Sequence, residues 1–139
     1  MIRMQIQTAV ILTGMLLLGG CQTSKAPSPG GGDPYPAPYN NPDISVLSPE
    51  LQPWLAFQPA TVVRSTGKPM AVQIPVRNMA DRGYLIDYRY LFYDENGMEI
   101  EPVMGWTMQS LEPKQIVYLK ANALDEQART YRLEVKWSR

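Results

Sequence analysis

Few residues in this chain of 139 have side chains that could carry out chemistry. There is a single cysteine, Cys21, and no histidine anywhere in the sequence. Without an imidazole, neither a Ser–His nor a Cys–His nucleophile pair can form, and a histidine-ligated zinc site is excluded too. A lone thiol also excludes a disulfide within the chain. The residue types therefore favour a protein that binds over one that catalyses.

Two other groups of residues could in principle form a site. Glu99 and Glu101 lie two positions apart, and paired carboxylates can divide acid and base roles when their environments separate their pKa values. The pair follows a predicted hairpin turn, and a hairpin tip is usually convex and exposed to water. We therefore interpret these two carboxylates as a solvated acidic rim. Thioether sulfurs could bind Cu(I), but methionine also fills core gaps, and copper sites usually add His or Cys. The methionines concerned are Met79, Met98, Met104 and Met108. We expect no catalytic residues, no metal site and no cofactor.

Cys21 closes an N-terminal segment whose pattern is typical of export. Arg3 is followed by an apolar run of about ten residues, which suits a signal peptide and is too short to span a membrane. The run ends at residues 18–21 (LGGC), which resemble the bacterial lipobox, where the cysteine thiol accepts a diacylglyceryl group. We expect residues 1–20 to be a lipoprotein signal peptide and Cys21 to carry acyl chains such as palmitate. Gln22 follows the cysteine at the position where an Asp would be the retention signal of enteric bacteria. We therefore expect the mature protein to be anchored at the periplasmic face of the outer membrane.

The charge balance of the chain excludes one class of partner. The 13 Lys and Arg residues equal the 13 Asp and Glu residues in number. Nucleic acid binding needs a surplus of cationic side chains to displace the counterions of the phosphates. We therefore expect no nucleic acid partner.

Residues 21–42 are predicted to form a disordered tether between the lipid anchor and a domain. The segment is rich in proline, glycine and small polar residues, which leave almost nothing to bury. The glycine run at 30–32 predicts a flexible joint, and residues 34–39 (PYPAPY) favour a stiffer polyproline II spacer. The alternative that this Pro/Tyr stretch is itself a ligand for an aromatic groove stays open.

Residues 43–139 are predicted to form one all-β sandwich, because apolar residues recur mostly at every second position. A helical turn should come first, with Ser48 as its cap and Pro49 in its first turn. Strands are predicted over about 56–65, 72–77, 84–93, 98–103, 105–108, 115–121 and 131–137. Pro75 cannot donate a ladder hydrogen bond, so its strand should lie at a sheet edge or carry a bulge.

The strand over residues 84–93 has the clearest alternation. One face carries Tyr84, Ile86, Tyr88, Tyr90 and Phe92, and the other carries Leu85, Asp87, Arg89, Leu91 and Tyr93. Asn96 and Gly97 then predict a tight hairpin, since both residue types tolerate positive φ. The second face is more apolar than a fully solvated one, through Leu85, Leu91 and Tyr93. Either the segment with Leu51 and Trp54 covers it, or these three residues form a partner-docking patch.

Several of these motifs together resemble a known family. Residues 88–98 (YRYLFYDENGM), Trp106, Leu111, Pro113 and residues 131–135 (YRLEV) resemble the YcfL-type family of small bacterial envelope lipoproteins. The resemblance implies an immunoglobulin-like antiparallel β-sandwich of unknown function with no established catalytic residues. Some members are encoded beside an activator lipoprotein of peptidoglycan synthesis, which implies a link to cell-wall machinery. The long Pro/Tyr tether and Pro75 depart from the family pattern.

Two functions follow as hypotheses. The first is a membrane-anchored, non-enzymatic envelope lipoprotein that binds or scaffolds another envelope protein. The second is a module that recognises glycan or peptidoglycan, with exposed Trp106 and Tyr93 stacking on sugar rings.

Overall fold

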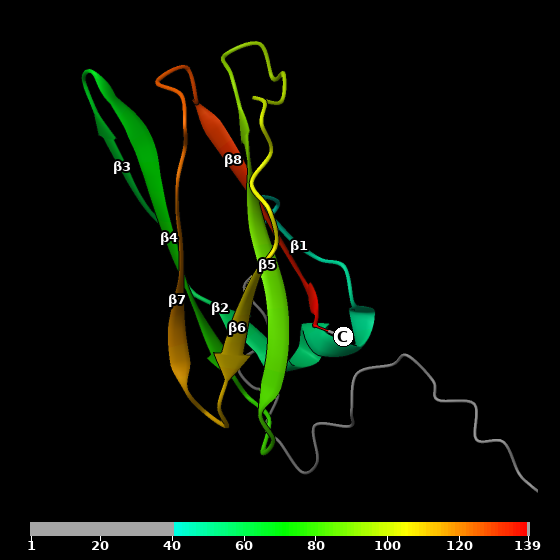
Figure 1. Ribbon diagram of the computed structural model, residues 1–139. Coiled ribbons are helices and arrows are strands. Elements are labelled where there is room, and N and C mark those ends of the chain that lie inside the picture. Colours follow the sequence, from blue (N-terminus) through cyan, green and yellow to red (C-terminus); the bar gives the residue numbers. More distant parts are fainter. Residues whose placement is uncertain (1–40, 139) are drawn as a thin grey trace, which may run out of the picture.

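The computed structural model describes residues 41–138, which form two β-sheets packed face to face (Figure 1). Sheet A has the order β1 (Ile44–Val46), β8 (Thr130–Trp137), β5 (Tyr84–Tyr93) and β6 (Thr107–Leu111). In sheet B, β4 (Lys68–Asn78) pairs with β7 (Ile116–Asn122) and also with β2 (Leu55–Phe57) and β3 (Thr61–Ser65). A short 3-10 helix, η1 (Pro49–Trp54), connects β1 to β2. The all-β sandwich expected from the sequence is confirmed.

The first strand is the one parallel member of an otherwise antiparallel set among the described residues. β1 runs parallel to β8, with Ile44 opposite Leu133 and Val46 opposite Val135. No strand was expected at these positions, because three residues are too few to show an alternating pattern. β1 forms because β8 offers it an open edge, so sheet A is mixed.

The core lies where the inner faces of the two sheets meet. The five β5 residues predicted to share one face are all buried: Tyr84, Ile86, Tyr88, Tyr90 and Phe92. The alternating residues Val72, Ile74 and Val76 of β4 are buried too. Of the four alternating residues of β8 that we expect to point inward, Leu133 and Val135 are buried, whereas Tyr131 and Trp137 are half-buried. Alternation alone indicated the buried residues, since successive side chains of a strand point to opposite faces.

The helical turn is present, but Ser48 does not cap it. Pro49 occupies the first position of η1, where its missing N–H costs nothing. The Ser48 hydroxyl makes no capping bond and instead accepts a 2.9 Å hydrogen bond from the backbone N–H of Trp137. The prediction of a side-chain cap is therefore wrong, because the last strand supplies a donor that is 89 positions away.

Pro75 lies in the centre of sheet B, so the predicted edge position is wrong. β4 pairs with other strands along both edges, and the register shift nearby falls in β3, between Val63 and Ser65. The Pro75 carbonyl accepts a 2.9 Å hydrogen bond from the backbone N–H of Gln58. The nitrogen of Pro75 faces the same side, where the predicted strand over 56–65 is interrupted between β2 and β3. The ladder therefore requires no N–H from Pro75.

The hairpin after β5 forms, with a different turn from the one predicted. Gly97 has a φ of 77°, but Asn96 does not share the positive φ that the Asn-Gly pattern predicted. The Asp94 carboxylate accepts hydrogen bonds from the backbone N–H groups of Asn96 and Met98, at 2.8 and 2.9 Å. This side chain stabilises a wider loop, in which one residue in the left-handed region is enough.

The chain after the hairpin returns beside β5 without forming the strand predicted over 98–103. Glu99 makes an isolated bridge with Tyr93, and the N–H of Ile100 donates to the carbonyl of Phe92 at 2.9 Å. Regular pairing resumes only with β6, whose Thr107 lies opposite Tyr88. The hairpin signal therefore predicted the turn but not the length of the partner strand.

Candidate binding surface

The predicted docking patch does not form as one surface. Leu85 is 47% exposed, whereas Leu91 is only 7% exposed and Tyr93 is half-buried. Leu85 and Leu91 are also six positions apart, which is about 20 Å along an extended strand. The prediction is wrong for Leu91, because its side chain is buried although it lies on the outer face of the strand.

The alternative cover for this face is also wrong. Leu51 of η1 is fully buried and belongs to the core cluster that joins both sheets, and Trp54 packs against the same cluster. The backbone carbonyl of Trp54 accepts from Met79, at the end of β4. The N-terminal segment therefore closes the sandwich core and leaves the outer face of sheet A open.

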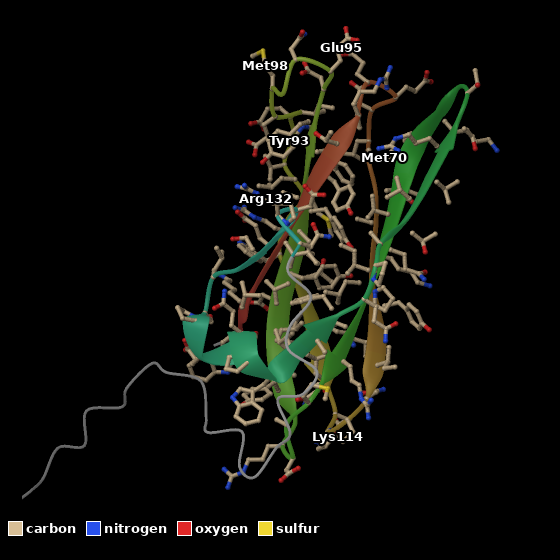
Figure 2. All side chains as sticks on the ribbon, turned by 180° about the vertical axis from the view of Figure 1, so that it is seen from behind. Met70, Tyr93, Glu95, Met98, Lys114 and Arg132 are labelled. Atoms are coloured by element: carbon tan, nitrogen blue, oxygen red, sulfur yellow. The ribbon has the colours of Figure 1, made fainter. Side chains whose placement is uncertain are left out.

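The two carboxylates considered above are open to solvent, and two of the four methionines lie far apart. Glu99 and Glu101 are both exposed, while Asp94 is occupied by the turn. Figure 2 shows Met98 and Lys114 at opposite ends of the sandwich. Met79 lies at the Lys114 end, because the Lys114 ammonium donates a 2.7 Å hydrogen bond to the Met79 carbonyl. Met79 is buried and Met98 is 66% exposed, so their sulfurs cannot share a ligand.

The outer face of sheet A brings together residues from three parts of the chain around Trp106. The Arg89 guanidinium lies 4.5 Å from the centre of the Trp106 ring, and the Lys136 ammonium lies 4.3 Å from it. Arg89 also forms a 2.7 Å ion pair with Glu134, its register partner in β8. These cation–π contacts hold the indole across β5 and β8, while 36% of Trp106 stays exposed.

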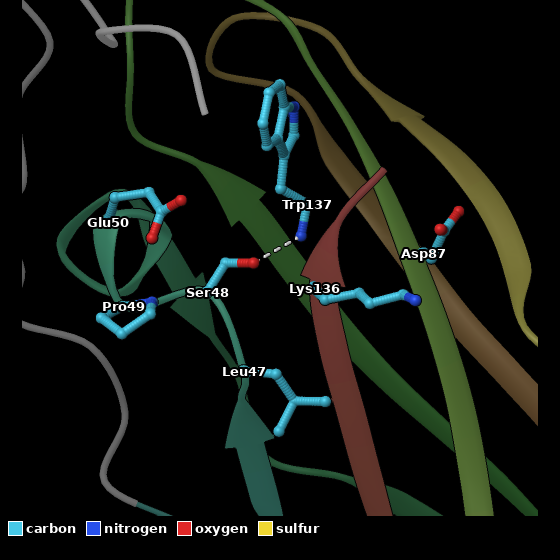
Figure 3. A pocket seen from close by; sticks show the side chains of 7 residues that line it. All are labelled: Leu47, Ser48, Pro49, Glu50, Asp87, Lys136 and Trp137. Atoms are coloured by element: carbon cyan, nitrogen blue, oxygen red, sulfur yellow. Dashed lines mark hydrogen bonds between the residues drawn. The ribbon is translucent and has the colours of Figure 1, made fainter. Parts of the chain in front are cut away.

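A pocket of about 580 Å³ lies next to the end of β8 and shares Lys136 with the stack on Trp106 (Figure 3). It is lined by Leu47, Ser48, Pro49, Glu50, Asp87, Lys136 and Trp137. Figure 3 shows the Lys136 side chain extending from β8 toward the strand that carries Asp87. Lys136 therefore belongs both to the pocket and to the stack on Trp106.

We define the outer-face patch as Leu47, Leu85, Asp87, Arg89, Trp106 and Lys136. Leu47 and Leu85 are each about half exposed and contribute apolar area, while Asp87 and Glu134 balance the two cations in formal charge. Such a surface suits a partner with both apolar and hydrogen-bonding groups. Sequence reasoning identified Trp106 and Leu85 but missed Leu47 and Lys136, because only the sheet order places β8 beside β5 and β1 on the other side of β8.

Residues 43–137 match the model of a protein family of unknown function, DUF1425. The chain belongs to the DUF1425 family. The match includes every strand of the DUF1425 domain described above and all residues of the outer-face patch. None of the curated proteins matches the chain.

Two solved structures share the fold. The Campylobacter jejuni protein cj0090 superposes with a TM-score of 0.58 at 16% identity, over 69% of this chain and 98% of that one. A DUF1425 family member from Shewanella sp. pv-4 gives a TM-score of 0.54 at 20% identity, over 60% of this chain and 78% of that one. At these identities the likeness extends to the fold alone. In the described part of this DUF1425 chain, no helix has the length and apolar character to cross a membrane.

Proposed function

We propose that this DUF1425 protein is a lipid-anchored envelope protein whose β-sandwich is a non-enzymatic binding or scaffolding module for another envelope protein. The anchor part of the proposal is supported by the lipobox-like residues 18–21, which lie outside the described residues. Gln22, in place of the Asp retention signal, supports a position at the periplasmic face of the outer membrane, and the resemblance to the YcfL-type lipoproteins supports a link to cell-wall machinery.

The binding part of the proposal is supported chiefly by the outer-face patch. Trp106 and Arg89 are of the residue types most enriched at the energetic centres of interfaces. Their positions are already restrained by the contacts with Lys136 and Glu134, so little side-chain entropy would be lost on association. The adjoining pocket adds concave area that a protruding partner side chain could fill.

Glycan recognition is the second candidate, and the same tryptophan supports it. An exposed indole beside a pocket with a carboxylate and an ammonium group, Asp87 and Lys136, offers apolar area together with hydrogen-bond acceptors and donors. Tyr93 is half-buried on β5, four positions from Arg89, so it would contribute less than the sequence suggested.

The anchor is tested by replacing Cys21 with serine in the full chain. A hydroxyl is a poor substitute for the thiolate nucleophile, so the variant should stay unprocessed or become soluble. Detergent partitioning and the mass of the mature protein provide the measurement. A Cys21→Ser protein that still partitions into detergent at the acylated mass would rule the anchor out.

The binding surface is tested by affinity capture from membranes, with Trp106→Ala compared with Tyr118→Ala. Tyr118 is a matched control, because it is 54% exposed on sheet B and has Lys120 at 6.0 Å from its ring. Loss of a central tryptophan should weaken capture by about tenfold or more. Sedimentation with purified cell wall distinguishes the glycan alternative. Equal binding by both variants in both assays would contradict a role for the outer-face patch.

A further inference from the structure

A second pocket, of about 230 Å³, lies between the β3–β4 hairpin and the loop before β8. Figure 1 shows this hairpin and this loop at the same end of the sandwich. Three cationic side chains line the pocket: Arg64 at the end of β3, Lys68 at the start of β4, and Arg129 just before β8. Arg64 and Arg129 are 65 positions apart in the sequence, so only the fold brings these charges together.

Both arginines are held in place by backbone carbonyls. The Arg64 guanidinium donates to the carbonyl of Arg129 at 2.7 Å. The Arg129 guanidinium donates to the carbonyls of Glu126 and Ala128, at 2.8 and 3.2 Å. The backbone N–H of Arg129 also donates to the backbone carbonyl of Tyr93 at 2.8 Å, and this bond fixes the loop to β5. Carbonyl oxygens orient a guanidinium group without neutralising it, so the charges stay available.

The pocket carries a surplus of positive charge. Arg64, Lys68 and Arg129 contribute three positive charges, and Glu126 contributes one negative charge, which leaves a formal charge of +2. None of the three cations forms an ion pair within residues 41–138. A phosphate monoester carries about −1.5 to −2 at neutral pH, so its charge matches that of the pocket better than a single carboxylate does.

We propose that this pocket binds a phosphate monoester group. A guanidinium group presents parallel N–H donors at the spacing of two phosphate oxygens, and each arginine here keeps donors that its carbonyl contacts do not use. Ser65 and Thr66 also line the pocket and provide hydroxyl groups near the hairpin tip. The phosphate could belong to a lipid headgroup of the anchoring membrane or to a soluble phosphorylated compound.

The test measures backbone hydrogen exchange on the full chain in phosphatidylcholine vesicles, at neutral pH and constant ionic strength. Inorganic phosphate should slow exchange at residues 64–68 and 126–129 in a saturable manner, and acetate should do so far more weakly. Lys68→Gln should weaken the effect of phosphate by about three- to tenfold. The Lys68 side chain makes no hydrogen bond or ion pair among the described residues, so this variant should fold normally.

The matched control is Arg82→Gln, which removes the same charge beyond the opposite end of β4. It should leave the phosphate response unchanged. Equal responses to phosphate, acetate and chloride, or equal losses in the two variants, would overturn the proposal. Vesicles that also contain phosphatidic acid distinguish the two sources. A weaker response to added phosphate there supports a lipid headgroup in the pocket, and an unchanged response supports a soluble phosphate ester.

Discussion

The Tyr90 hydroxyl of β5 donates a 2.6 Å hydrogen bond to the backbone carbonyl of Leu119 in β7, and this bond joins the two sheets through the core. Both residues are fully buried. Three aromatic rings have their centres 6.0 to 6.3 Å from the Tyr90 ring: Tyr88, Phe92 and Tyr131. A buried hydroxyl requires a partner, so this contact fixes the relative position of the two sheets and also contributes to their stability.

Replacing Tyr90 with phenylalanine should lower the free energy of unfolding by about 1–2 kcal/mol, because the hydrogen bond between the sheets is lost. Urea denaturation measures the difference. Tyr88→Phe is the matched control, since the Tyr88 hydroxyl makes a longer 3.4 Å bond to the carbonyl of Lys120 and is less buried. An equal or larger loss in Tyr88→Phe would contradict the role assigned to Tyr90.

The same tyrosine should make the domain sensitive to alkali. Burial raises the pKa of Tyr90 well above its ordinary value of 10.0, and the nearby Tyr131 and Tyr88 add to the effect. Because the folded pKa exceeds the unfolded one, the stabilisation is complete below about pH 10 and declines as the pH rises further, when only the unfolded state loses the proton.

The expected decline is about 1.4 kcal/mol per pH unit for one such group. Urea midpoints measured from pH 8 upward should show it, and Tyr90→Phe should make the profile flatter. Burial also raises the pKa of Tyr84, against the opposing charge of Arg82, so part of the slope should remain in that variant. An unchanged slope in Tyr90→Phe would show that other groups govern alkaline unfolding.

Asn78 should be the most sensitive polar position of the described domain. Its side chain is fully buried, donates to the carbonyls of Arg82 and Leu111 at 2.7 and 3.1 Å, and accepts from the N–H of Ala80 at 2.9 Å. Asn78→Ala leaves these buried groups without a partner and should cost about 2–4 kcal/mol in thermal or urea unfolding. Asn122→Ala, at an exposed position, should cost less than about 0.5 kcal/mol.

The two leucines of the outer face should respond differently to an introduced charge. Leu91→Asp places an unpaired carboxylate at a buried position and should lower stability by several kcal/mol. Leu85→Asp, at a position that is 47% exposed, should leave the melting temperature nearly unchanged. Tyr90→Asp should unfold the domain, and this variant gives the largest loss of stability with which the other two are compared. A normal melt for Leu91→Asp would show that this side chain is accessible in solution.

The alternation of side chains determined most of the strands. The bounds of β5 were predicted to the residue, and the buried faces of β4 and β8 followed from the same pattern, since the direction of a side chain is a local property of an extended strand. The absence of histidine and the motif at Cys21 are likewise properties of the sequence that need no fold.

Tertiary structure decided which strands became neighbours, and with them every feature that depends on distant residues. Pro75 is accommodated at the centre of sheet B because the strand beside it is interrupted, and Ser48 binds Trp137 because β1 aligns with β8. Trp106 contacts Lys136 because sheet A places β8 and β6 on either side of β5. Local patterns contain the period of a strand but not its partner, because pairing depends on the free energy of the whole packed core.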